Sequence, residues 1–503
     1  MFLWQKHSPN LTRLMRPSNM KNHLDVFIAS NNGVPSFNPL DSDGTSNAIH
    51  VEQLVGTLVR MHPSGRYQGY LAESWKNTSD FKEWSFQLKK GLTCEDGSPI
   101  TAENFATSLH RVIRLFKKHS AIPLIDRLQG YDELEKSGRI RGILSEGDTL
   151  ILRFDKPVET GLLEYLALPF LGFYCDANFN EDGSWKDNFH IISSASYRVD
   201  NWQGVGPVDM KLREEWMQFS KRPPESLRIT TEGPEQIKAP NERAFIFSYI
   251  LEKNKIPKDF SVVKMLPTIF NGIMISPSKN PWLSNMKNRR ALRDAIKKAQ
   301  QEVPLTIESA SIVDSFYPHM SENFEALNEI SDEITLPSIP LVVVTSEKPT
   351  PQAQYQLDVL LVALKSMDIP FEIKTRETGQ KDMMMNYRDP KNYDLQPVGV
   401  NVGGGIENQL IKFMFCSNLG VAFSDPSKRV CALVEDYENI YGDTVPREAM
   451  REYIKKFDDY VWQDAAVVPL LKTGHAWLLS PDLSLETVNP TMDTPYFDLF
   501  ELK

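Results

Sequence analysis

A strand–helix–strand pattern in the last third of the chain constrains the fold most strongly. Leu341 to Val344 are consecutive apolar residues, the pattern of a strand that is buried on both faces. Residues 352–367 then place apolar side chains at helical spacing, and residues 371–374 form a second strand. Because parallel strands need a long crossover, usually a helix, this unit predicts a parallel sheet flanked by helices. With a further strand expected over 393–400, ligand sites are predicted at the carboxyl ends of these strands.

Strand and helix patterns also recur before and after this unit. Apolar residues that alternate with polar ones predict strands over 24–30, 84–88, 148–154, 197–199 and 244–249. One helix is expected on the apolar face made by Val51, Leu54, Val55, Leu58 and Val59, one from the N-cap Thr101 to Phe116, and one from about Pro446 to Val461. This mixture of elements is typical of an α/β protein.

The length and the charge of the chain bound its class. At 503 residues, it is long enough for about three domain-sized units. Its 66 acidic residues outnumber its 56 basic ones, and the net charge of -10 has the wrong sign for binding nucleic-acid phosphates. No stretch approaches the ~20 apolar residues of a membrane helix. We therefore expect a globular protein without a nucleic-acid partner.

Sequence motifs of common catalytic and cofactor sites are not found. The chain has no HExxH, GxSxG or GxxxxGKS/T motif, and no GxGxxG follows a predicted strand. The four cysteines show neither a CxxC pair nor zinc-type spacing, so neither a metal nor a cofactor is expected. The cysteines are expected to be inert thiols, except that Cys416 and Cys431 are close enough along the chain for a disulfide in an oxidising compartment. No enzymatic activity is predicted.

Several motifs, in order along the chain, are similar to those of one protein family. They are Phe37-Asn38-Pro39, the Leu-Ala-Glu-Ser-Trp block at 71–75, the strand at 84–91, the Asp-Gly-Ser-Pro-Ile-Thr-Ala-Glu-Asn-Phe block at 96–105, Arg289-Arg290-Ala291-Leu292 and Val467-Val468-Pro469-Leu470. From about residue 24 to its end, the chain resembles the family 5 extracellular solute-binding proteins, which are oligopeptide, dipeptide and nickel receptors of ABC importers.

The resemblance implies a two-lobed α/β fold of the large periplasmic-binding-protein type (type II) with an additional inserted domain. The expected division is a flexible basic extension at 1–21, a discontinuous first lobe at 22–45, 186–268 and 478–503, an inserted domain at 46–185, and a second lobe at 269–477. The two lobes would close like a hinge on a ligand, because contacts made to both lobes at once favour the closed form.

The resemblance also implies a binding site between the lobes. Its expected residues are Phe37, Asn38, Tyr197, Asn401, Gly403 and Gly404. An alternative, that Phe37 and Tyr197 are core aromatics near the hinge, explains these two residues equally well. The position of the family's amine-binding Asp is occupied by Val402, beside which Asn401 would offer a neutral contact. The family's GTGPY block corresponds to residues 193–197 here, Ser-Ser-Ala-Ser-Tyr, without the glycines.

The expected partners follow from the same resemblance. They are a small ligand, in the first place an oligopeptide, and ABC permease subunits, with a monomeric receptor. Because the amine-binding Asp is absent, an oligosaccharide, an opine or a capped peptide stays open as the ligand. The Cys416 and Cys431 spacing resembles a pair that some dipeptide receptors bridge.

The resemblance further implies a periplasmic or extracellular location, although no signal peptide is recognisable in the chain as given. The alternative is the cytoplasmic ligand-sensing domain of a transcription regulator, which would need a DNA-binding module in front of the domain, where only ~20 residues are present.

Overall fold

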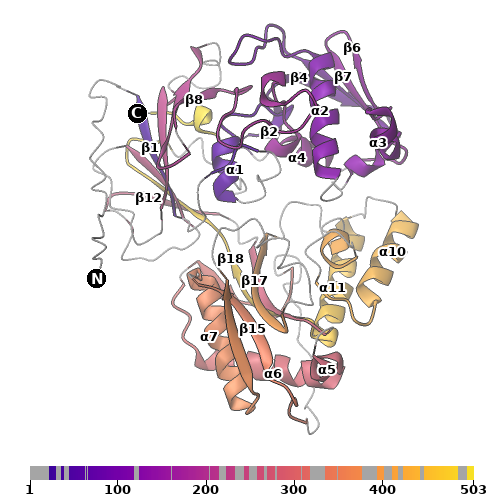
Figure 1. Cartoon of the computed structure of the whole chain (residues 1–503), viewed down its shortest axis with the longest axis vertical. Coiled ribbons are helices and arrows are strands. Elements are labelled where there is room, and N and C mark those ends of the chain that lie inside the picture. The colour runs from indigo at the N-terminus through magenta and orange to yellow at the C-terminus, as the bar shows by residue number, and fades with distance from the viewer. Residues whose placement is uncertain are drawn as a thin grey trace, which may run out of the picture.

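Two lobes, each centred on one sheet, lie one above the other in the computed structural model (Figure 1). The described residues are 22–29, 35–38, 45–62, 64, 66–117, 124–159, 161–202, 204–214, 223–232, 243–248, 256, 258–265, 269–277, 280–307, 309–317, 335–347, 349–376, 393–401, 411–416, 423–441, 447–484 and 495–502. The basic extension predicted at 1–21 lies outside them. The predicted α/β class and the two-lobed arrangement are confirmed.

The upper lobe contains a seven-stranded sheet of order β12-β19-β11-β1-β10-β9-β8. Its central strand β1 (His23–Ala29) runs parallel to β10 (Ser226–Glu232) and β11 (Ala244–Ser248). The antiparallel outer strands are β8 (Tyr197–Asn201), β9 (Val208–Leu212), β12 (Ser261–Lys264) and β19 (Ala476–Leu479). The strands predicted over 24–30, 197–199 and 244–249 are thus confirmed.

An inserted unit, comprising the elements from β2 to α4, lies between β1 and β8 in the sequence and beside the upper sheet in Figure 1. Its strands are β2 (Val59–Met61) and β3 (Tyr67–Gly69), which pair with each other, and β4 (Ala72–Asn77), β5 (Glu83–Leu88), β6 (Ile143–Glu146) and β7 (Thr149–Arg153), which form an antiparallel sheet of order β4-β5-β7-β6. Its helices are α2 (Ala102–Lys117), α3 (Leu134–Ser137) and α4 (Leu162–Leu166).

The sequence predicted three elements of the inserted unit correctly, β5, α2 and β7. Thr101 caps α2, since its Oγ1 accepts a hydrogen bond from the Asn104 amide at 3.1 Å. Helix α2 packs against β6 and β7, and Phe105 and Leu109 belong to a core shared with these strands. The helix expected on the apolar face from Val51 to Val59 was wrong. Helix α1 (Thr45–Val51) ends at the first residue of that face, and Val59 begins β2. The helical spacing was misleading because the turn and strand residues that follow α1 are buried as well.

The lower lobe contains a six-stranded sheet of order β14-β18-β13-β17-β15-β16. Its strands are β13 (Ile269–Ile275), β14 (Ala310–Ile312), β15 (Leu341–Ser346), β16 (Phe371–Arg376), β17 (Leu395–Asn401) and β18 (Val467–Thr473). The predicted crossover is confirmed, with α7 (Pro351–Ser366) joining the parallel strands β15 and β16. The sheet is nevertheless mixed rather than parallel, because β13 runs antiparallel to both β17 and β18.

Helices cover both faces of this lower sheet. Leu341 and Val343 pack with α7 and with α6 (Met286–Glu302), whereas Val342 and Val344 pack with α10 (Arg429–Tyr441) and α11 (Arg447–Asp464). Alternate residues of β15 thus enter two different cores, which explains the continuous apolar run. A short helix, α5 (Pro281–Ser284), precedes α6. Within the described part of the chain, no helix is long and apolar enough to span a bilayer.

The Arg-Arg-Ala-Leu motif at 289–292 has a structural role in this lobe. Arginines of α6 donate to successive carbonyl oxygens at the C-terminus of α11. The contacts are Arg293 Nη1 to Trp462 O at 2.7 Å, Arg290 Nε to Gln463 O at 2.7 Å, and Arg289 Nε to Asp464 O at 2.8 Å. Cations at a helix C-terminus are favourable because carbonyl oxygens without an intrahelical partner carry partial negative charge there. The motif therefore fixes α11 against α6.

Candidate functional site

The chain passes between the two sheets at two adjacent places. Strand β12 of the upper sheet leads into β13 of the lower sheet, and β18 of the lower sheet leads back into β19. The two passages are joined by a hydrogen bond from the Met265 amide to the His475 carbonyl oxygen, 2.9 Å long. Hinge motion between two packed lobes is found where a few neighbouring chain segments connect them, as they do here.

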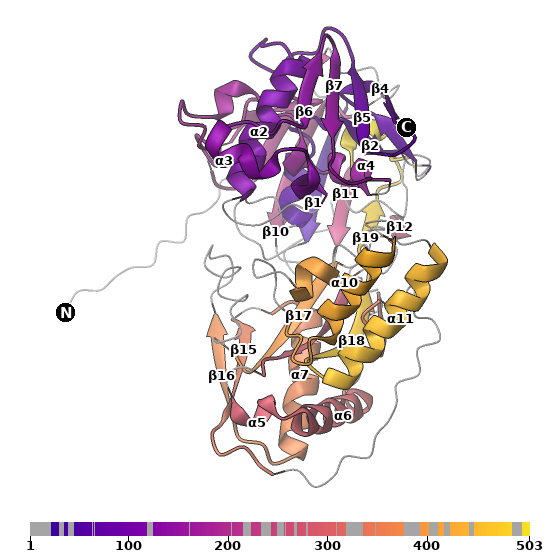
Figure 2. The same cartoon turned by 90° about the vertical axis from the view of Figure 1, so that its right-hand side faces the viewer.

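The parallel strands of both sheets end at these passages. In the upper sheet, Ser248, the last residue of β11, pairs with Ala476, the first residue of β19. In the lower sheet, Ile269, the first residue of β13, pairs with Asn401 and Thr473, the last residues of β17 and β18. Figure 2 shows the arrowheads of β10 and β11 directed toward the lower lobe and those of β15 and β16 directed toward the upper lobe. The carboxyl edges of the two sheets therefore face each other, and ligands bind at such edges in open α/β sheets.

One predicted site residue lies at the lower of these edges. Asn401 is the last residue of β17, where the sequence placed a ligand contact. The predicted Gly403 and Gly404 follow it directly in the sequence, outside the residues that the structure describes.

The predicted residues Phe37 and Asn38 lie in the upper lobe and are buried. The Phe37 ring is 0% exposed, and its centroid is 5.2 Å from that of Trp202. The Phe37 amide donates to the Asn188 carbonyl at 2.8 Å, and the Asn38 side-chain amide donates to Asn188 Oδ1 at 3.1 Å. Asn188 thus holds both predicted residues in place.

Tyr197 begins β8, the edge strand of the upper sheet, and shares an apolar core with Phe37. Its ring is 0% exposed, and its hydroxyl donates to the Pro224 carbonyl at 2.8 Å. Burial raises the pKa of Tyr197 well above its usual value, so the phenol stays neutral. These surroundings favour the alternative that Phe37 and Tyr197 are core aromatics. Tyr197 lies in the upper lobe and Asn401 in the lower lobe.

Two serines of the 193–197 block form hydrogen bonds with backbone groups. Ser193 Oγ donates to the Leu54 carbonyl at 3.0 Å, and Ser194 Oγ accepts from the Gly56 amide at 2.9 Å. The carbonyl oxygen of Ser194 lies so close to Gly56 that a Cβ at position 56 would come within 2.6 Å of it. The block therefore fastens the segment between α1 and β2 to the chain just before β8.

A buried ion pair that the sequence did not predict lies near this block. Arg60 Nη1 donates to both carboxylate oxygens of Asp498 at 2.8 Å, and the two side chains are 1% and 4% exposed. The Arg60 guanidinium also lies 4.3 Å above the Tyr70 ring, and the Ser196 hydroxyl donates to the same carboxylate. Burial disfavours the charge of Arg60, but the attraction and hydrogen bond to Asp498, together with attraction to Tyr70 and Tyr496, outweigh it, so the pKa of Arg60 is raised.

His475, between β18 and β19, is a second residue that the sequence did not single out. It is 3% exposed, and its ring centroid is 4.9 Å from that of Phe247 on β11. Burial lowers the pKa of His475 to about 4, so the imidazole is neutral at neutral pH. The polar Thr473-Gly474-His475 break between two apolar strands is the sequence signal that could have marked this passage.

All four cysteines are joined in disulfides, Cys94 with Cys175 and Cys416 with Cys431. The expectation that Cys94 and Cys175 are inert thiols was therefore wrong, because the fold brings together residues that are 81 positions apart. Among the described residues, no group of three His, Cys, Asp or Glu side chains is arranged to hold a metal ion.

Comparisons with known proteins agree with the resemblance seen in the sequence. Residues 66–300 match the family model described as bacterial extracellular solute-binding proteins, family 5 Middle. The periplasmic oligopeptide-binding protein OppA of Haemophilus influenzae is 38% identical over 88 residues, which are 17% of this chain and 16% of that protein. OppA of Salmonella typhimurium is 26% identical over 187 residues, 35% of this chain and 34% of that protein. The matched stretches thus span at most about a third of these relatives.

Similarity to solved structures extends over almost the whole chain. A structure of Haemophilus influenzae OppA in complex with the peptide RPPGFSPFR has a TM-score of 0.72 at 15% identity and covers 96% of this chain and 99% of that one. The murein tripeptide binding protein MppA of Escherichia coli has a TM-score of 0.74 at 14% identity and covers 95% and 98%. At these identities, the comparisons establish the fold.

Proposed function

Because the chain belongs to the family 5 extracellular solute-binding proteins, we propose that it is the receptor of an ABC importer, which captures an oligopeptide or a similar solute between its lobes and delivers it to a membrane permease. The observation that carries this proposal is the position of the two carboxyl edges, which face each other across the paired chain passages. A ligand held there contacts both lobes at once.

The mechanism requires only differential binding. The empty receptor favours the open form, and a ligand that contacts both edges binds the closed form more tightly. A shift from 1:99 to 99:1 in favour of the closed form needs about 5.5 kcal/mol of differential affinity. We place the axis about which the lobes would turn at the backbone pair of Met265 and His475, which joins the two chain passages. No covalent step is involved, and the permease would recognise the closed form.

The candidate ligand contacts divide between the lobes. We place Asn401, Gly403 and Gly404 on the lower side of the ligand and Asn38 on the upper side, with Phe37 and Tyr197 as the core that supports it. The proposed division of the chain is a first lobe at 22–45, 186–268 and 478–503, an inserted domain at 46–185 and a second lobe at 269–477. Names of relatives that include oligopeptide and murein tripeptide binding proteins support a peptide or a peptide-like ligand.

The location and the partners follow from this function. Both disulfides fit an oxidising compartment, which favours a periplasmic or extracellular receptor over a cytoplasmic sensor. The partners would be ABC permease subunits, and the receptor would act as a monomer.

Ligand binding is expected to raise the melting temperature of the receptor. A ligand present at 100 times its dissociation constant adds about 2.7 kcal/mol to the free energy of unfolding. A thermal-shift screen should compare tri- to pentapeptides, the same peptides with acetylated N-termini, oligosaccharides, opines and chelated nickel. We expect peptides to shift the melting curve and the acetylated forms to be tolerated, because no acid occupies the family's amine-binding position. A panel in which nothing shifts the curve contradicts the receptor function.

Replacing Asn401 with alanine is expected to weaken peptide binding about tenfold, since a ligand hydrogen bond contributes roughly 1.4 kcal/mol. Isothermal titration would measure the dissociation constant, and the melting temperature of the empty variant should stay within about 1 °C of the parent. The exposed Asn77 on β4, in the inserted unit, offers a matched control, because Asn77→Ala should leave affinity unchanged. Equal affinity in both variants would remove Asn401 from the site.

A further inference from the structure

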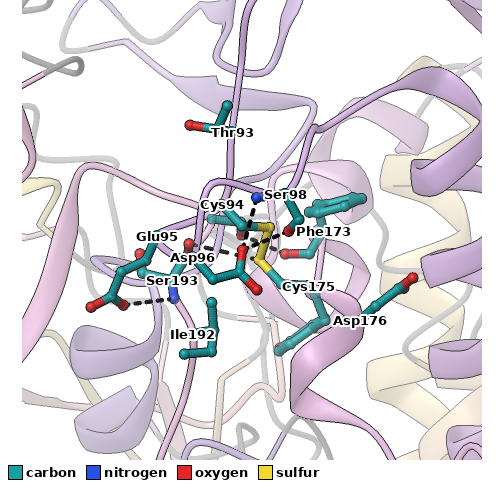
Figure 3. Close-up of a disulfide and its surroundings, with 12 residues drawn as sticks. Thr93, Cys94, Glu95, Asp96, Ser98, Phe173, Cys175, Asp176, Ile192 and Ser193 are labelled. Carbon is teal, nitrogen blue, oxygen red and sulfur yellow. Dashed lines mark hydrogen bonds between the residues drawn. A yellow bond between two sulfur atoms is a disulfide. The ribbon is translucent and has the colours of Figure 1, made fainter.

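The Cys94–Cys175 disulfide lies at the junction between the inserted unit and the upper lobe (Figure 3). Cys94 belongs to a tight hairpin at 93–99, in which Gly97 adopts a φ of +84° and the Asp96 carboxylate accepts a hydrogen bond from the Ser98 amide at 2.9 Å. Cys175 follows α4, toward the end of the proposed inserted domain at 46–185. The disulfide therefore joins this hairpin to the segment through which the chain leaves the unit.

Hydrogen bonds connect the same hairpin to the upper lobe. The Glu95 amide donates to the Ser193 carbonyl at 2.8 Å, and the Ser193 amide donates to the Glu95 carboxylate at 3.2 Å. Arg213, which directly follows β9 and is 4% exposed, donates to the Thr93 carbonyl at 2.8 Å and to the Ser193 carbonyl at 3.2 Å. The Cys175 sulfur is itself 3.7 Å from the Ser193 carbonyl oxygen. Three chain segments thus meet at the disulfide.

The two disulfides of the chain differ in burial and in the length of chain that they enclose. Cys94 and Cys175 are 2% and 0% exposed and 81 positions apart. Cys416 and Cys431 are half-buried and 15 positions apart. A longer enclosed loop removes more entropy from the unfolded chain, and a buried disulfide is out of reach of reductants in the folded state.

We propose that the Cys94–Cys175 disulfide is an oxidation-dependent lock within the inserted unit, which fixes the hairpin at 93–99 in the position where it bonds the upper lobe, and that a disulfide-donating oxidant is a partner in folding. Formation of the bond removes two protons and two electrons from the two thiols, and the donor disulfide takes them up and is released as two thiols. The lock does not depend on the identity of the ligand. Without the bond, the hydrogen bonds to Ser193 and Arg213 would still join the hairpin at 93–99 to the upper lobe, but the hairpin would no longer be fixed to Cys175.

The first test compares two double variants under non-reducing conditions. Cys94→Ala with Cys175→Ala should lower the melting temperature by roughly 5 °C or more, whereas Cys416→Ala with Cys431→Ala should lower it less. Hydrogen exchange should become faster at the amides of 93–99 and 193–197 in the first variant only. Unchanged exchange at these amides would overturn the proposal even if the variant melts earlier.

The second test uses the parent chain and does not depend on whether a variant folds. The native protein is treated with a reductant, and the thiols that appear are alkylated and located by mass spectrometry. Cys416 and Cys431 should be labelled in the folded state, and Cys94 and Cys175 only after unfolding. Reduced, unfolded protein should regain a protease-resistant inserted unit when it refolds with oxidised glutathione and not when it refolds in dithiothreitol. Equal labelling of all four cysteines, or equal recovery in both refolding buffers, would contradict the lock.

Discussion

Replacing Asp498 with alanine is expected to lower the free energy of unfolding by about 3–5 kcal/mol, because the change leaves the Arg60 charge buried without its counter-ion. The loss should extend beyond the ion pair. Asp498 also accepts a hydrogen bond from the Ser196 hydroxyl, and the neighbouring Phe497 amide donates to Gln53 at 3.1 Å. Chemical denaturation of the purified protein, followed by tryptophan fluorescence, would measure the change.

Two further variants separate the buried charge from a general loss of packing. The double variant Arg60→Met with Asp498→Leu should recover much of the stability, since apolar residues of similar size often replace a buried ion pair without loss. Glu452→Ala on α11 removes an exposed ion pair with Lys456, 2.8 Å long, and should cost no more than about 0.5 kcal/mol. If Asp498→Ala costs as little as Glu452→Ala, the ion pair does not hold the C-terminal segment in place.

Acidification from pH 6.5 to pH 4 is expected to lower the free energy of unfolding by about 3 kcal/mol through His475 alone. Burial lowers the pKa of His475 in the folded state from 6.5 to about 4, so the unfolded chain binds the proton first as the pH falls. The neutral imidazole contributes fully to the free energy of unfolding above pH 6.5. This contribution decreases as the pH falls, and it no longer changes with pH below pH 4. Denaturation curves across this range would measure it.

A variant without the titrating group isolates this contribution. His475→Leu should flatten the pH dependence between pH 4 and pH 6.5, whereas His62→Leu at an exposed position should leave it unchanged. Part of the dependence should persist in His475→Leu, because the pKa of His110 is also lowered to about 4, by burial and by Arg139 and Arg114. An unchanged slope in His475→Leu would show that the imidazole is solvated between the strands.

The elements that the sequence predicted correctly are those whose patterns are local. The strand, helix and strand from Leu341 to Arg376 could be predicted because the apolar spacing within each element is sufficient. The helix expected across Val51 to Val59 failed because buried turn residues can repeat at the same spacing as a helix face. The direction of β13 could not be predicted, since it depends on the neighbours that the fold supplies.

The site residues were expected from the family resemblance and remain predictions. The structure places Asn401 at the end of β17, at a carboxyl edge where ligands bind in open α/β sheets. Arg60 and Asp498 are 438 positions apart in the sequence, and Cys94 and Cys175 are 81 positions apart. No local sequence pattern connects two residues across such separations. The burial of Phe37 and Tyr197 likewise depends on neighbours that a linear sequence does not specify.

The order of the strands along the chain determines when each lobe can be completed during synthesis. All strands of the lower sheet come from one stretch, from Ile269 to Thr473. The upper sheet begins with β1, but it needs β19 and the segment around Asp498, which are made after all strands of the lower sheet. The lower lobe can therefore finish folding while the upper lobe is still incomplete. A chain that still lacks β19 has no complete upper edge opposite the lower one, and under the proposed function we expect such a chain not to retain a solute.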